Sequence, residues 1–295
     1  MDSSRPAGAG NLVRRVGFAV VAIPLALAVI WFGGLPLTFL LAVTGALGAR
    51  ELFDLAARQG IQAARTFGFV SAAAVAPLTY AALVAPDVRV WLVPAWPYLA
   101  ALWLIALLTW ALAARAPAEK PLEAASVTML AVAYTSGLPA FLILIRHSQF
   151  AEKSWAAAWL VFFPLVVTWV CDTAAMFGGR MLQGPKLAPS ISPGKTRSGA
   201  AAGVVGALLV APIFGAIVFP RVGIDVPLWQ LLAVAAVLSV IGQIGDLVES
   251  LMKREAGVKD SSHLIPGHGG VLDRFDSLYF VIPSSAAMYR LFGII

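Results

Sequence analysis

Charged side chains are concentrated in one window of an otherwise strongly apolar chain, residues 245–278, GDLVESLMKREAGVKDSSHLIPGHGGVLDRFDSL. Carboxylates in this window alternate with Lys and Arg. Carboxylates bind hard divalent cations such as Mg²⁺, which proteins normally share with substrate phosphates, and Lys and Arg bind the phosphates themselves. The mixture therefore suits phosphoryl or nucleotidyl transfer. A solvated loop with internal salt bridges would also mix both signs of charge, but it would need neither the PGHGG turn nor a polar stripe that enters an apolar segment.

The apolar segment before this window carries that stripe. Its polar residues are Ser239, Gln243, Asp246, Ser250 and Lys253. Steps of four and three residues place them on one face of a helix, with Glu249 one turn from Asp246 on the same side. An acid within or at the edge of a membrane span is costly and usually faces a cavity or a partner. Asp246 therefore either lines a site or pairs with a neighbouring Arg or Lys at a helix contact.

The turn PGHGG at 266–270 predicts close contact between the backbone and an anion. Gly269 and Gly270 would let backbone N–H groups approach an oxyanion with no Cβ in the way. His268, between glycines, would contact a phosphate or donate an N–H. A zinc site is not expected, because the chain has one cysteine and three histidines, with no E-x-x-H pattern. That cysteine, Cys171, is expected to be a small buried apolar residue.

A second polar stretch, WVCDTAAMFGGRMLQGPKLAPSISPGKTRSGA at 169–200, resembles the first in style. It has an acid near the end of an apolar segment (Asp172), a Gly-Gly-Arg turn ending at Arg180, and a basic Ser/Pro/Gly loop with Lys195. The loop is not a P-loop, because Pro189 stands where that motif needs glycine. No strand pattern is predicted. Lys195 either contacts substrate or only contributes to the positive charge expected of a cytoplasmic loop.

Composition predicts an all-α polytopic integral membrane protein. The 295 residues are 60% hydrophobic and 12% charged, against roughly 25% charged residues in soluble domains. Because a span needs about 20 apolar residues, about nine transmembrane helices are expected, the second being short. The nine ranges are 16–33, 35–49, 67–85, 91–113, 124–145, 155–178, 199–219, 226–250 and 276–293.

The distribution of Lys and Arg predicts a cytoplasmic N-terminus. That orientation puts most of the 21 basic residues, and both charged loops, 179–198 and 251–275, on the cytoplasmic side. The net charge of +6 is scattered over short loops and does not indicate nucleic-acid binding. The predicted organisation is a cytoplasmic tail (1–15), an N-terminal transmembrane bundle (16–150) and a C-terminal transmembrane catalytic region (151–295).

The charged window resembles the signature of the phosphatidate cytidylyltransferase (CDP-diacylglycerol synthase) family. The matching positions are Ser250, Lys253, Arg254, Lys259, Asp260, Pro266, His268, Gly269, Gly270, Asp273, Arg274 and Asp276. GDLVES, CDTAAMFGGR and SPGKT are also similar, so the resemblance covers roughly 165–278. The family usually shows Ser-Pro-Lys-Lys-Thr-x-Glu-Gly in the second loop, whereas this chain has Gly194 in place of one Lys and Ser198 in place of the Glu. This departure puts the role of that loop in doubt.

The resemblance implies that CTP and phosphatidate form CDP-diacylglycerol and pyrophosphate. One or two Mg²⁺ would assist the reaction, and whether a monovalent cation joins them is left open. The expected metal ligands are Asp246 and Asp273, then Asp276 and Glu249, with Asp172 as a ligand or the partner of a cation. The expected catalytic residues are Asp246, Asp273, Lys259, Arg274 and His268. The expected substrate-binding residues are Lys253, Arg254, Gly269, Gly270, Lys195, Ser192, Arg180, Gln243 and Ser239.

Three alternatives stay open at this point. One is a CTP-dependent enzyme of the polyprenol kinase type, with another acceptor. The second is a secondary transporter, which is disfavoured because the charge is concentrated in loops of one half of the chain. The third is a non-catalytic relative that binds CTP or lipid. The expected partners are CTP, phosphatidate and membrane lipid, in a monomer or a homodimer, in a bacterial inner membrane with a cytoplasmic active site.

Overall fold

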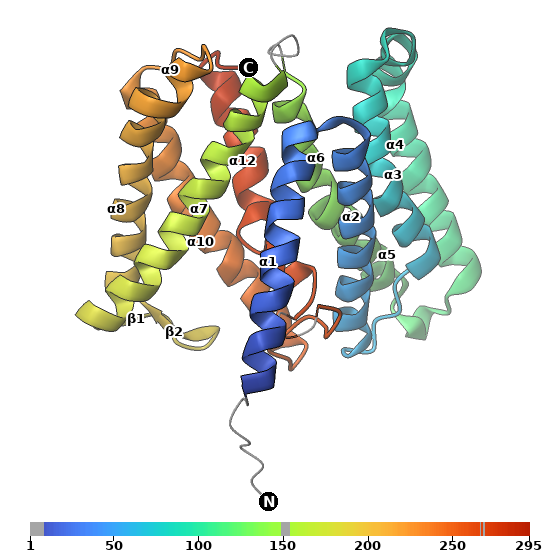
Figure 1. Cartoon of the computed structure of the whole chain (residues 1–295). Helices are drawn as coiled ribbons and strands as arrows, with labels where there is room; N and C mark the ends of the chain where they lie inside the picture. The colour runs from blue at the N-terminus through green and yellow to red at the C-terminus, as the bar shows by residue number, and fades with distance from the viewer. Residues whose placement is uncertain (1–8, 149–153, 266, 268) are drawn as a thin grey trace, which may run out of the picture.

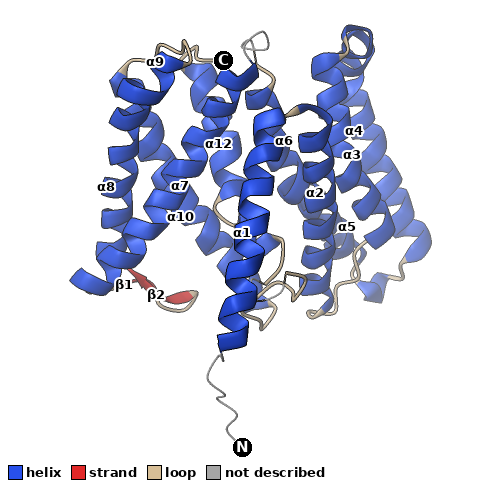
Figure 2. Ribbon diagram, viewed as in Figure 1, coloured by secondary structure: helices blue, strands red, loops and turns tan. Residues whose placement is uncertain are grey.

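The structure, a computed structural model, is a bundle of long helices with one small strand pair at its lower end (Figures 1 and 2). It describes residues 9–148, 154–265, 267 and 269–295, so the predictions for the first eight residues, Pro266 and His268 lie outside it. The α-helices are α1 (Ala9–Phe32), α2 (Gly34–Ala57), α3 (Arg65–Val84), α4 (Pro86–Ala114), α5 (Pro121–Val132), α6 (Leu138–Arg146), α7 (Ser154–Leu182), α8 (Arg197–Ile213), α9 (Phe219–Arg221), α10 (Leu228–Glu255), α11 (Leu272–Phe275) and α12 (Leu278–Leu291). Shorter elements are the 3₁₀ turn η1 (Pro117–Glu119), the π-helical turns η2 (Ala133–Gly137) and η4 (Phe214–Val218), and the strands β1 (Lys186–Ala188) and β2 (Ser192–Thr196).

The prediction of an all-helical membrane protein is confirmed at the level of helix length and composition. Within the described ranges, seven helices are long and apolar enough to cross a membrane, from α2 to α10. The first predicted span corresponds to α1, in which Val20–Phe32 forms a shorter apolar stretch. The last predicted span corresponds to α12, which has 14 residues. The total of nine crossings and the orientation stay predictions.

The second predicted span, 35–49, was too short. Helix α2 has 24 residues and continues to Ala57. Its last two turns stay helical because Leu52, Phe53 and Leu55 are buried in the bundle, although Arg50, Glu51 and Asp54 make this stretch less apolar than the run before it. A helix does not have to end where the hydrocarbon ends, and this extension carries Glu51 into the protein interior.

The second polar loop contains strands, which were not predicted. β1 pairs antiparallel with β2, with Lys186 opposite Thr196 and Ala188 opposite Ser192. The pair, called the ribbon below, is short and irregular, and local contacts hold it. The Thr196 hydroxyl caps α8 by accepting a hydrogen bond from the Gly199 N–H at 3.1 Å. A strand pair this short has too few alternating residues to leave a periodic signal in the sequence.

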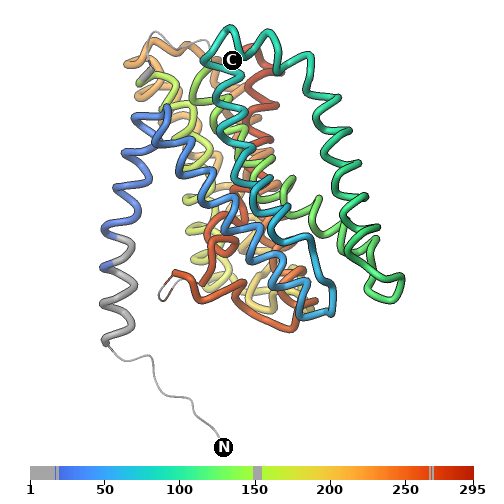
Figure 3. The backbone as a smooth tube through the Cα atoms, turned by 90° about the vertical axis from the view of Figure 1, so that its right-hand side faces the viewer, coloured from blue at the N-terminus to red at the C-terminus, as the bar shows by residue number. Residues whose placement is uncertain are grey.

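Small residues let α7 and α8 pack closely above the ribbon. A Cβ on Gly206 would collide with the Ala174 side chain, and one on Gly203 would lie 3.0 Å from the Cys171 sulfur. Such contacts between small residues are typical of helices packed within membranes. Cys171 is buried, as expected. Helices α10 and α12 pack beside this pair, whereas α1 and α4 lie at the outside of the bundle (Figure 3).

Candidate active site

A polar cleft of about 810 Å³ opens between α7, the ribbon, α8 and α10. The ribbon, the end of α7 and the start of α8 lie at one end of the bundle, the end at which α1 begins (Figure 1). Residues predicted from both polar stretches meet in its lining, namely Asp172, Arg180, Lys195, Gln243 and Asp246. Lys186 also lines the cleft. Ligand pockets for small molecules are typically of this size.

Asp246 makes the ion pair that the alternative interpretation expected, and it also faces the cleft. Its Oδ2 lies 2.5 Å from the Lys195 Nζ, and each of these side chains is more than a quarter exposed. Its Oδ1 accepts a hydrogen bond from the Ser250 hydroxyl at 3.3 Å. The pair joins α10 to the ribbon across the cleft and leaves both charges accessible to a ligand.

Gln243 and Ser239 lie deeper on the same helix. The Gln243 amide donates to the Ser239 carbonyl at 3.1 Å and to the Ala200 carbonyl at 3.4 Å. This orients its carboxamide between α10 and α8. Ser239 is only 1% exposed, and its hydroxyl donates to the Ala236 carbonyl. The structure thus places Gln243 in the cleft wall and Ser239 behind it, in the protein interior.

Two further carboxylates interact with Asp246. Burial and repulsion from Asp246 raise the pKa of Asp276 to about 6, although its carboxylate accepts the Ser277 N–H. Asp172 interacts electrostatically with both Asp276 and Asp246. Among the described residues, no group of three or more His, Cys, Asp or Glu is close enough to hold a metal ion alone. Mg²⁺ commonly binds one or two carboxylates and completes its shell with water and substrate phosphates, so this donor set fits that ion.

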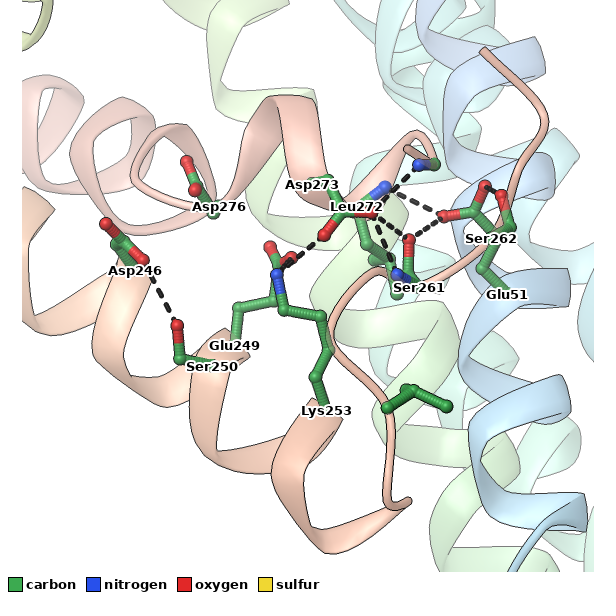
Figure 4. Close-up of polar contacts among 12 residues, drawn as sticks. Glu51, Asp246, Glu249, Ser250, Lys253, Ser261, Ser262, Leu272, Asp273 and Asp276 are labelled. Atoms are coloured by element: carbon green, nitrogen blue, oxygen red, sulfur yellow. Dashed lines mark hydrogen bonds and ion pairs between the residues drawn. The ribbon is translucent and has the colours of Figure 1, made fainter. Parts of the chain in front are cut away.

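Asp273 lies in a different environment, beside Glu249 and Lys253 of α10 and away from Asp246 (Figure 4). Its Oδ1 is 2.6 Å from the Lys253 Nζ, and this Nζ also donates to Glu249 at 2.9 Å. Its Oδ2 accepts from the Ser261 N–H, the Ser261 hydroxyl and the Gly270 N–H, each at 2.8 Å. Burial raises the pKa of Asp273, but these hydrogen bonds and the Lys253 charge outweigh it, and the pKa falls below its usual range.

Asp273, Lys253 and Glu249 are therefore linked to one another, and the residues lining the cleft do not include them. All three are buried. The oxygens of Asp273 make four contacts with protein donors, whereas those of Asp246 make two and face the cleft, so Asp273 has less capacity for a metal ion than Asp246. The metal-binding role of Asp273 and Glu249 and the substrate-binding role of Lys253 stay predictions.

The glycine turn closes on carboxylates of the protein itself. The Gly270 N–H donates to Asp273, and a Cβ on Gly270 would collide with the Glu51 carboxylate and the Ser261 hydroxyl. Gly269 has φ +82°, which favours glycine. The anion that the Gly270 N–H contacts is thus a side chain of this chain, and the predicted contact of Gly269 and Gly270 with substrate stays a prediction.

The remaining predicted residues lie at the surface or in the ribbon. Lys259 and Arg274 are exposed. Arg254 donates to the Ile191 carbonyl at 3.2 Å, which joins the end of α10 to the ribbon turn. Ser192 is a residue of β2 and pairs with Ala188. His268 lies outside the described residues, and its role stays a prediction.

Two residues of this region were missed. Lys186 was not among the predicted site residues, and its place opposite Thr196 in the ribbon brings it to the cleft. Glu51 was given no role, yet it is 3% exposed and contacts the turn after α10. The sequence signal for Glu51 was an acid that lies directly beside apolar residues, in ARELFDL at 49–55.

Comparisons with known proteins place the chain in a family. The model of the cytidylyltransferase family matches residues 13–292. The chain therefore belongs to the cytidylyltransferase family. A phosphatidate cytidylyltransferase of Bacillus subtilis (strain 168) is 47% identical over 133 residues, which is 45% of this chain and 48% of that protein. One of Brucella suis biovar 1 is 51% identical over 139 residues, 46% of this chain and 47% of the relative. The matched stretch thus spans about half the length of these curated relatives.

Proposed function

We propose that this protein transfers a cytidylyl group from CTP to phosphatidate, forming CDP-diacylglycerol and pyrophosphate. An oxygen of the lipid phosphate attacks the α-phosphorus of CTP, a new P–O–P linkage forms, and the bond to the β-phosphate breaks. Phosphate monoesters have a second pKa near 6, so the attacking group is already largely dianionic at pH 7. The site must then neutralise charge and align two anions, and it needs no strong base.

The observation that carries the proposal is the cleft itself. Basic and acidic side chains from α7, the ribbon and α10 converge there at the end of apolar helices. Lys195, Lys186 and Arg180 suit the triphosphate and the lipid phosphate, because Lys and Arg pair with phosphate oxygens. The first turn of α8 also borders the cleft at Gly199 and Ala200, and the N-terminus of a helix favours anions.

Mg²⁺ is proposed as the cofactor, held by Asp246 with Asp276 and Asp172 nearby. A bound divalent cation would neutralise phosphate charge. Asp246 suits the ion because its present partner, Lys195, is on the ribbon and is 29% exposed at the side chain. The proximity of Asp276 raises the cost of leaving these acids without a cation, as its raised pKa indicates.

The changed residues of the second loop are compatible with this proposal. Gly194 lines the cleft and has open space where a Cβ would be. The Ser198 hydroxyl contacts the Thr196 hydroxyl and the Gln183 carbonyl. Ser198 therefore joins the ribbon to the end of α7 at the position where the family usually has Glu. We place the site on the cytoplasmic side, where CTP is available, at the same end as the start of α1.

The test is incorporation of labelled CTP into lipid by the purified protein with phosphatidate and Mg²⁺ in mixed micelles. Asp246→Asn is expected to lower kcat by about 10³-fold while the protein stays folded. The matched control is Asp225→Asn, at an exposed acid between α9 and α10, which should retain full activity. A wild-type protein that uses polyprenol acceptors instead, or that binds CTP without turnover, would contradict the proposal.

A further inference from the structure

Glu51 is a buried carboxylate that binds a segment more than two hundred residues away. Its Oε1 accepts the Ser262 hydroxyl at 2.7 Å and the Val271 N–H at 2.9 Å. Its Oε2 accepts the Leu272 N–H at 2.9 Å and lies 2.8 Å from the Ser261 hydroxyl, whose single proton it shares with Asp273. Among the described residues these four donors are all uncharged. The carboxylate is thus compensated by hydrogen bonds instead of a cation, as buried charges require.

The four donors come from the two ends of the segment between α10 and α11. Ser261 and Ser262 follow α10, whereas Val271 directly precedes α11 and Leu272 begins it. Glu51 lies on α2, in the N-terminal bundle (Figure 4). One side chain therefore closes the segment upon itself and attaches it to another part of the fold. The collision expected for a Cβ at Gly270 shows how closely the backbone approaches this carboxylate.

The contacts continue from Glu51 toward the cleft. The Ser261 hydroxyl lies 2.8 Å from both Glu51 Oε2 and Asp273 Oδ2. Asp273 pairs with Lys253, and Lys253 pairs with Glu249 on α10. Glu249 lies one helical turn after Asp246, which lines the cleft. A displacement of the segment would therefore change the environment of the α10 turns that carry Asp246.

We infer that Glu51 is a positioning residue for the cytidylyl transfer, acting as the anchor that holds the segment between α10 and α11 in its active geometry. The inference rests on the proposed function for its catalytic part. Glu51 does not line the cleft, so it acts through Asp273 and Lys253 and not by touching substrate. Its role requires two acceptor oxygens, because each oxygen receives one backbone N–H that cannot rotate away.

Two substitutions separate this role from simple packing. Glu51→Gln keeps the volume of the side chain but replaces one acceptor oxygen with an NH₂ group. Whichever way the amide is turned, that group then faces the N–H of Val271 or Leu272, donor against donor. Glu51→Asp loses a methylene but keeps both acceptors. A positioning role predicts that Gln is the more harmful change, whereas a packing role predicts that Asp is.

The experiment measures two quantities in the full-length protein in detergent: amide hydrogen exchange of 256–273, and kcat and KM for CTP. Glu51→Gln is expected to speed exchange of the segment about ten-fold. It should lower kcat by about 10- to 100-fold with KM changed less. Compared with Glu51→Gln, Glu51→Asp should show slower exchange of the segment and a higher kcat. The matched control is Asp54→Asn, on the same helix, in an exposed pair with Arg65, which should match wild type.

Unchanged exchange in Glu51→Gln would overturn the inference, as would faster exchange with wild-type kcat, or a lower kcat for Asp than for Gln. If Glu51→Gln does not fold, Ser262→Ala decides, since it removes one donor to Oε1. Faster exchange with a kcat lowered about three-fold would support the anchor, and no change in either would refute it. A wild-type protein without transferase activity would defeat the proposed function instead, and the exchange comparison would still show whether Glu51 anchors the segment.

Discussion

Asp246 and Asp273 belong to the same charged window, yet the protein surrounds them differently. Asp246 lines an open cleft, and its lysine partner, Lys195, is on the ribbon. Asp273 is buried, and its lysine partner, Lys253, is only 10% exposed at the side chain. The Asp246 pair crosses a cleft between two elements, whereas the Asp273 pair lies inside a network that also includes Ser261 and Gly270.

The difference shows how one signature can serve two purposes. A carboxylate with open coordination can exchange its lysine for a metal ion or leave that lysine to a phosphate. A carboxylate whose oxygens already accept hydrogen bonds from buried donors stabilises the conformation instead. We therefore expect that substitutions in the cleft reduce activity with little effect on stability, and that substitutions in the buried network reduce stability and reduce activity only through the position of the segment after α10.

Lys253→Met should have the largest effect on stability. It leaves Glu249 and Asp273 buried without their shared cation, which should lower the free energy of unfolding by about 3 kcal/mol. Chemical unfolding in detergent measures it. The control is Lys120→Met in the exposed pair with Glu123, expected to cost no more than about 0.5 kcal/mol. Equal effects of the two changes would remove the contrast between buried and open pairs.

Lys195→Met should show the opposite pattern. The pair with Asp246 is partly exposed, so the free energy of unfolding should change by less than about 1 kcal/mol. The loss of a phosphate-binding cation should lower kcat/KM for CTP by about 10²-fold. The comparison variant is Arg197→Met, an exposed residue that begins α8. A Lys195→Met protein that is destabilised but fully active would reverse the assignment of the two regions.

The raised pKa of Asp276 predicts that the free energy of unfolding depends on pH when divalent cations are absent. Its pKa in the folded protein is about 6, above the usual value of 3.8, so the folded state binds the proton more tightly. The resulting stabilisation is complete below about pH 4 and is lost as pH rises to about 6. Asp276→Asn should remove this loss, which is about 2 kcal/mol after allowance for partial exposure. Unfolding curves measured between pH 4 and pH 7 in EDTA, for wild type and variant, would show parallel profiles if Asp276 is not responsible.

Gly194→Lys should have the smallest effect. It restores a residue common in the second loop of the resembling family, at a cleft position with open space. An added exposed charge contributes up to about 1 kcal/mol, so KM for CTP should fall by no more than about five-fold. Steady-state kinetics at fixed Mg²⁺ would measure it, with Gly194→Ala as the control. A large gain would indicate that the ribbon of this chain is impaired by its glycine.

The sequence alone determined the helical membrane class, the family resemblance and much of the cleft. These depend on local quantities: the length of apolar runs, the 3.6-residue period that aligned Gln243 with Asp246, and the composition of the second polar stretch. Local composition and helical period depend on residues close together along the chain, so the sequence alone reveals them. In the structure Asp172, Arg180 and Lys195 line the same cleft as Asp246.

Only the tertiary structure decided which carboxylates are open and which are enclosed. Asp246 and Asp273 look alike in the signature, and the difference arises from Lys195 on the ribbon and from Glu51 on α2. Glu51 lies 210 positions from Ser261, and no periodicity or spacing links residues so far apart. Their contact exists because α2 extends beyond its apolar run and packs against the turn after α10, which is a property of the folded chain.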